Sequence, residues 1–209
     1  MKRLLKITCF TILVFSAFAA TAHDGHPDSK AVATRLALRD LWVDHVFWVR
    51  NVVVAHAEKD KKAQDAAEAQ AVDNAKKIAA AIEPFYGKAA NEKLFGLLAG
   101  HYGAIKDYMT ATIPKPNLAK QKAAAEKLTA NAMEIASFLS GANPNLPKET
   151  LVGLLAAHGG HHIDQITQIQ KKDYGAEAET WAGMKHHMYT IADALTSGIA
   201  KQFPAKFEK

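Results

Sequence analysis

One ten-residue pattern occurs twice in this chain, with a histidine at the same place in each copy. Residues 94–103 and 151–160 both read L-x-G-L-L-A-x-H-x-G, which puts His101 and His158 57 residues apart. The segments ahead of the copies, residues 74–82 and 131–139, share a second pattern at the same offset. Because one offset relates two separate segments, and both have helical spacing, we predict a duplicated helical hairpin.

The remaining sequence favours an all-α fold. It is rich in alanine, leucine, lysine and glutamate, which are good helix formers, and no segment shows the period-two alternation of strands. Clusters of proline and glycine at 83–87, 114–116 and 141–147 mark breaks between helices. We therefore predict an up-and-down bundle of about six helices. The predicted helices cover residues 29–58, 61–82, 90–112, 117–139, 148–172 and 177–202.

The duplicated hairpin divides this bundle into units. The first repeat unit is predicted at residues 61–112 and the second at residues 117–172, with the first and last helices on either side. The length is right for one domain with a sizeable core, so residues 29–209 are predicted to form a single helical-bundle domain.

The first 22 residues have the pattern of an export signal. Three basic residues precede an apolar run at 7–19 that is too short to span a bilayer, and Ala20-Thr21-Ala22 fits a small-x-small cleavage site. Removing these 22 of the 209 residues leaves 187, takes away the only cysteine and lowers the formal net charge from +5 to +2. We therefore expect a periplasmic or secreted protein with a flexible N-terminus at residues 23–28. We expect no nucleic-acid partner and no stable membrane insertion.

Four of the predicted helices direct a histidine toward the interior. His101 and His158 follow leucines at three and four positions, which is the spacing of a core-facing site, and His45 and His187 also have apolar neighbours one turn away. His162 comes one turn after His158, and this i,i+4 spacing suits two ligands of one metal ion. The candidate metal ligands are therefore His158, His162, His101, His45 and His187.

The histidine pattern leaves two alternatives open, because a histidine on an apolar face is more often a hydrogen-bonded core residue than a ligand. In the first, the imidazoles hold a metal ion. Few carboxylates accompany them, so copper, zinc or nickel is expected. Ring nitrogens of His101 and His158 that share an ion should lie within about 4–5 Å. In the second, the histidines form a polar layer with Asn74, Asn131, Asp44 and water as partners.

Several stretches taken together resemble a family of small bacterial helical proteins. The resemblance covers most of the chain beyond the signal segment and implies an all-helical domain without pointing to an activity. His45, His101 and His158 fall where that family also has histidine, whereas residues 159–162 depart from its pattern. The stretches are residues 41–50, 81–87, 131–136, 143–144, 192–195 and 198–204.

Residues 158–165 resemble the H-x-x-H-H-x-x-Q stretch of DinB-like proteins. Those proteins are metal-binding four-helix bundles, some of them thiol-dependent transferases. There the first and last histidines of the stretch bind the metal together with a third histidine from another helix. The resemblance implies that His158 and His162 are ligands and that His45 or His101 completes the set. Ile163 stands where that family has arginine.

Three functional hypotheses follow from these patterns. The first is an exported bundle that binds copper, zinc or nickel in metal handling or sensing. The second is a DinB-like metal-dependent enzyme, which needs three ligands and an open coordination position. The third is a structural or partner-binding bundle whose histidines belong to the core. No arrangement of nucleophile and base can be recognised in the sequence, so no catalytic residue is predicted.

Overall fold

The computed structural model describes residues 30–208. The predicted signal segment and the predicted flexible N-terminus lie outside the described residues. Six long helices and one short helix account for nearly all of the described chain, which contains no strand, so the all-α prediction is confirmed. These helices are α1 (Lys30–Ala57), α2 (Lys61–Ala80), α3 (Glu83–Tyr86), α4 (Lys88–Thr112), α5 (Leu118–Ala142), α6 (Lys148–Lys171) and α7 (Tyr174–Gln202). A 3-10 turn, η1 (Pro204–Lys206), follows α7.

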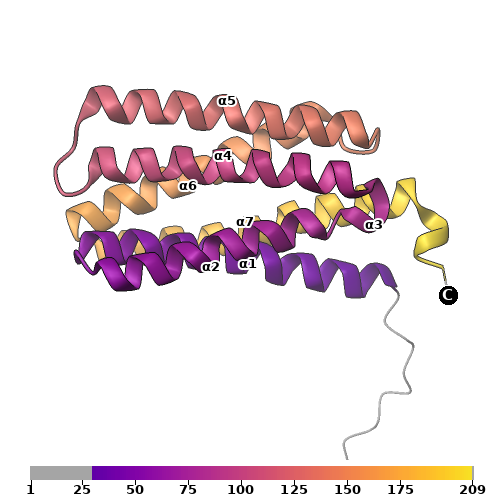
Figure 1. Ribbon diagram of the computed structural model, residues 1–209, viewed down its shortest axis with the longest axis horizontal. Coiled ribbons are helices and arrows are strands. Elements are labelled where there is room, and N and C mark those ends of the chain that lie inside the picture. The colour runs from indigo at the N-terminus through magenta and orange to yellow at the C-terminus, as the bar shows by residue number, and fades with distance from the viewer. Residues whose placement is uncertain (1–29, 209) are drawn as a thin grey trace, which may run out of the picture.

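The long helices run up and down along one axis (Figure 1). Three antiparallel hairpins, α1–α2, α4–α5 and α6–α7, follow one another in the chain. Helix α2 packs on α4, α5 packs on α6, and α7 packs on α1, so the hairpins form a closed bundle. Helix α6 also contacts both α1 and α4. The three helices that carry His45, His101 and His158 are thus brought together inside the bundle.

The helix boundaries differ from the predicted ones by up to three residues, as at the end of α5, which reaches Ala142 rather than 139. Pro84 was expected to end a helix, but it lies in the first turn of α3, where a missing N–H costs nothing. Gly87, at φ 82°, then separates α3 from α4. Helix α7 begins at Tyr174 rather than near 177, because the Asp173 side chain caps it by accepting a hydrogen bond of 3.2 Å from the backbone N–H of Ala176.

The core divides into two apolar clusters along the bundle axis. The α3-end cluster lies toward α3 and includes Trp42, Leu98 and Leu155. The opposite cluster lies toward the α4–α5 loop and includes Val49 and Ile105. On α1, α4 and α6 the central histidine comes at the boundary between these clusters. A layer of polar side chains therefore crosses an interior that is otherwise apolar.

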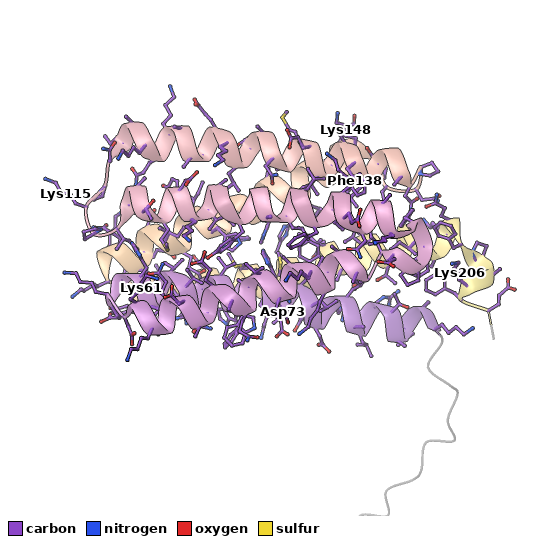
Figure 2. All side chains as sticks on the ribbon, in the orientation of Figure 1. Lys61, Asp73, Lys115, Phe138, Lys148 and Lys206 are labelled. Atoms are coloured by element: carbon purple, nitrogen blue, oxygen red, sulfur yellow. The ribbon has the colours of Figure 1, made fainter. Side chains whose placement is uncertain are left out.

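The outer surface of the bundle is charged. Side chains fill the space between the ribbons, while Lys61, Lys115 and Lys148 project outward (Figure 2). Within residues 30–208, no helix combines the length and the apolar character that a membrane span requires.

Candidate metal centre

Four buried histidines meet at the middle of the bundle. His45 comes from α1, His101 from α4, and His158 and His162 from α6. Each histidine offers one ring nitrogen to this centre, and the four nitrogens all lie within 4.8 Å of one another. Their exposed fractions are between 1% and 4%. This histidine cluster contains four of the five histidines predicted as ligands, at the separation expected for a shared ion.

The pair on α6 has the spacing of two ligands of one ion. One helical turn separates His158 from His162, and their Nε2 atoms lie 3.2 Å apart. An ion with tetrahedral bonds of 2.0–2.1 Å sets two ligand nitrogens about 3.3 Å apart. The separation is that of a hydrogen bond between the two rings, and it also matches one edge of a coordination tetrahedron.

The two histidines of the repeated pattern lie face to face. The rings of His101 and His158 stack with centroids 5.4 Å apart and planes inclined by 14°. The His45 ring lies 5.6 Å from that of His158 and 6.5 Å from that of His101. Rings from three helices thus surround one point. The duplication of the hairpin itself stays a prediction.

Asn131 of α5 fixes the orientation of one ring. Its Nδ2 donates a hydrogen bond of 3.0 Å to the carbonyl oxygen of Leu97, so its Oδ1 faces His101 and lies 3.1 Å from Nδ1. Because this oxygen only accepts, Nδ1 carries the proton and Nε2 keeps its lone pair. This is how a residue outside the coordination shell orients a histidine ligand.

Gly100 makes room for that asparagine. A Cβ at Gly100 would lie 3.1 Å from Nδ2 of Asn131, which is tighter than ordinary packing. The second copy of the repeated pattern has Ala157 at this position. The two copies therefore differ beside their histidines, and the Asn131 contact is specific to the first.

The three hairpins share one side-chain contact that the sequence analysis missed. The leucine four residues before each central histidine has a carbonyl oxygen that accepts a hydrogen bond from the other helix of its hairpin. Asn74 donates to Leu41 at 2.9 Å, Asn131 to Leu97 at 3.0 Å and His187 to Leu154 at 2.8 Å. These partners are 33, 34 and 33 residues apart in the chain. That regular separation, read from each leucine, is the signal that could have revealed the contact.

His187 lies apart from the histidine cluster. Its Nε2 donates to the Leu154 carbonyl, and its ring lies beside that of His161, with centroids 5.6 Å apart. Although His187 has apolar neighbours on its own helix, it is only half-buried. Of the five predicted ligands, it is the one that the structure does not bring to the common centre.

Burial keeps the clustered imidazoles neutral. Desolvation lowers the pKa of His45 to about 3, with a further contribution from His101, and lowers the pKa of His101 to about 4 against the opposing effect of its Asn131 hydrogen bond. Desolvation and the neighbouring imidazoles lower the pKa values of His158 and His162 well below their usual range. At neutral pH all four rings therefore carry a lone pair.

Several of these ring nitrogens lack a hydrogen-bond partner among residues 30–208. They are both nitrogens of His45, Nε2 of His101 and Nδ1 of His158. Of the protein partners expected for a polar layer, only Asn131 hydrogen-bonds a clustered histidine. Asn74 donates to the Leu41 carbonyl, and Asp44 is exposed. Buried polar atoms without partners are costly, and an ion bound among the rings would satisfy their lone pairs.

The available donors at this centre are imidazoles alone. Glu177 is the only buried carboxylate in the described part of the chain. Arg50 binds both of its oxygens, at 2.7 and 2.8 Å, and Gln165 donates to one of them at 2.9 Å. This network ties α1, α6 and α7 together. It also leaves the carboxylate engaged, so the ligand set is nitrogen only.

Comparison with known proteins gives no assignment for this centre. No protein-family model matches the chain, and neither the curated proteins nor the solved structures contain a match.

Proposed function

We propose that this chain binds a transition-metal ion, either copper, zinc or nickel, through His45, His101, His158 and His162. The observation that carries the proposal is the convergence of four buried imidazoles whose ring nitrogens lie within 4.8 Å of one another. We further propose a role in metal handling or sensing. The export signal predicted at residues 1–22 supports a location in the periplasm or outside the cell.

The chemistry of the donors supports this choice of metals. Imidazole suits zinc, copper and nickel, whereas magnesium and calcium prefer oxygen ligands. Metal binding normally has to displace protons from its ligands. The lowered pKa values of the four histidines remove that competition at neutral pH. Among divalent ions the usual affinity order then favours copper.

A metal-dependent enzyme is the second candidate function. Three histidine ligands leave a fourth coordination position for water or substrate, as in catalytic zinc sites. The specific observation in its favour is that three of the four histidines also line an internal cavity. The structural hypothesis, in contrast, needs water as the partner of the His45 nitrogens, because no side chain or backbone group among residues 30–208 hydrogen-bonds them.

A loading experiment with matched variants tests the proposal. The purified chain is stripped of metal, incubated with copper, zinc or nickel, desalted and analysed for bound metal by mass spectrometry. We expect stoichiometric metal in the wild type and none in the His158→Ala/His162→Ala double variant. The control is the His161→Ala/His187→Ala double variant. It removes two histidines of the α6–α7 hairpin that lie outside the histidine cluster, and it should retain metal. A wild type that binds none of the three metals, or equal retention in both variants, would contradict the proposal.

A further inference from the structure

An internal cavity begins at the histidine cluster and extends through the α3-end cluster. His45, His101 and His158 line it, whereas His162 does not. It continues past Leu139 to Tyr86, near the end of the bundle that contains α3. Phe138, another lining residue, lies on α5 in the half of the bundle toward α3 (Figure 2). An ion held by the histidines would therefore face this cavity from one end.

The walls of the cavity are almost entirely apolar. Apart from the three histidines, Trp42 and Tyr86, every lining side chain is aliphatic or phenylalanine. The Tyr86 hydroxyl is engaged, since it donates to Gln202 at 2.8 Å and accepts from Asn143 at 2.9 Å. The indole N–H of Trp42, by contrast, is a buried donor without a hydrogen-bond partner among the described residues. The polar groups left to act on an occupant are thus the imidazoles and this indole.

The size of the cavity limits what can occupy it. Its volume is about 40 Å³. One water needs roughly 10–15 Å³ by this kind of measure, and an apolar cavity of about 150 Å³ stays dry and binds benzene. The cavity therefore has room for a molecule of two or three heavy atoms. A neutral, weakly polar molecule meets such walls without the desolvation cost of an ion or a strongly hydrated solute.

We propose that this cavity holds a small neutral molecule of two or three heavy atoms, of the class of dioxygen or carbon monoxide, on the open side of the histidine-bound ion. The inference rests on the proposed metal-binding function and specifies the ligand of the same site: when three of the four histidines hold the ion, the fourth position of its tetrahedron is open to the cavity. His45, His101 and His158 present the ion to the cavity, the aliphatic walls exclude water and larger solutes, and Trp42 offers one hydrogen-bond donor to the bound molecule.

Two probes test this inference separately from metal binding. Xenon, followed by its NMR chemical shift, reports on the cavity in metal-free protein. Carbon monoxide, followed by its infrared band, reports on the open position of a copper(I)-loaded centre. We expect saturable xenon binding without metal and a carbonyl band with copper(I), the band being absent from the His158→Ala/His162→Ala double variant. Trp42→Phe keeps an aromatic ring but removes the donor, and should shift the carbonyl band.

Filling the cavity supplies the matched variants. Leu139 lines the cavity on α5, and Leu139→Phe should abolish xenon binding, whereas Leu139→Ala enlarges the cavity and should retain it. The control is Leu128→Phe, the same change on the same helix within the opposite cluster, which should not alter xenon binding. Thermal unfolding by circular dichroism checks that each variant is folded. If Leu139→Phe does not fold, xenon binding by the wild type and by Leu139→Ala still tests the inference, because loss of binding in either protein would contradict it.

The possible results separate the two proposals. If the protein binds metal but fails to bind either xenon or carbon monoxide, this inference is overturned and the proposed function stands. Xenon binding without any metal binding would overturn the proposed function, and with it the place of the small molecule at an ion. Xenon binding that Leu139→Phe and Leu128→Phe affect equally would also overturn the inference, because the xenon would then not occupy this cavity.

Discussion

Helix α6 takes part in two histidine groups that use their ring nitrogens in opposite ways. On the inner side, His158 and His162 join His45 and His101, and several ring nitrogens have no hydrogen-bond partner among residues 30–208. On the outer side, His161 lies beside His187, whose Nε2 donates to the Leu154 carbonyl. Proximity of two imidazoles alone is not sufficient for a metal site. Lone pairs must also be free and directed to one point.

The largest expected effect that separates the two groups is acid destabilisation of the metal-free protein. The folded-state pKa values of the four clustered histidines lie below the unfolded value of about 6.5, at about 3 for His45 and about 4 for His101. Below pH 6.5 the unfolded chain therefore binds more protons than the folded chain, and stability is lost as the pH falls toward 4. Each buried histidine contributes about 1.4 kcal/mol per pH unit within that window.

Denaturant unfolding at a series of pH values measures this effect. The slope of unfolding free energy against pH should be steep between pH 6.5 and 4. His45→Leu removes one of the titrating histidines and should reduce this slope by about 1.4 kcal/mol per pH unit. A free energy of unfolding that stays constant across this range would show that the clustered histidines are not held neutral by the fold.

The next largest effect is stabilisation by metal. An ion that binds only the folded state adds about 4 kcal/mol when its free concentration is about 1,000 times its Kd. The thermal midpoint of the wild type should therefore rise with added zinc or copper, and that of His187→Ala should rise equally. The midpoint of His162→Ala should rise far less. Equal shifts in all three proteins would place the bound metal outside the histidine cluster.

A smaller effect is expected at Asn131, which orients His101 but does not reach the ion. Asn131→Leu should lower metal affinity by about 10- to 100-fold, the usual range for a residue that positions a histidine ligand. Asn74→Leu is the matched control. It loses an equivalent hydrogen bond to a leucine carbonyl, but its hydrogen bond on the α1–α2 hairpin goes to Leu41, and none joins it to a histidine. Competition titration against a chelator of known affinity compares the two variants, and equal losses would refute the positioning role.

The smallest effect is expected in the outer group. His187→Ala removes the hydrogen bond to Leu154 and should lower the free energy of unfolding by about 1 kcal/mol, with metal affinity unchanged. Denaturant unfolding and the same competition titration measure both quantities. A loss of metal affinity in this variant would show that the outer group contributes to the site.

The sequence predicted the bundle and the interior position of the four clustered histidines for the same physical reason. Leucines three and four residues before His101 and His158 define a core-facing helix side, and this rule depends only on helical periodicity. It failed to separate His187 from the others. The apolar neighbours of His187 lie on its own helix, whereas the group that engages its ring nitrogen is the Leu154 carbonyl on another helix. Such a contact depends on how two helices pack.

Two other features of the structure, a buried glutamine and the cavity, could not be predicted from the sequence of any single helix. Gln165 of α6 is a polar residue, yet it is buried, and Glu177 of the next helix accepts its hydrogen bond. The cavity is lined by residues from every long helix and from the α5–α6 loop, so its existence depends on how those side chains pack together. Periodicity along one helix carries no information about either feature.

X-ray absorption of the zinc- or copper-loaded protein tests the central claim most directly. We predict a first shell of three or four nitrogens at about 2.0–2.1 Å with the outer-shell scattering of imidazole rings. The nitrogen count should fall by one in His158→Ala and remain the same in His187→Ala. A first shell dominated by oxygen, or one that is unchanged when His158 and His162 are both replaced, would contradict a metal centre built from the buried histidines.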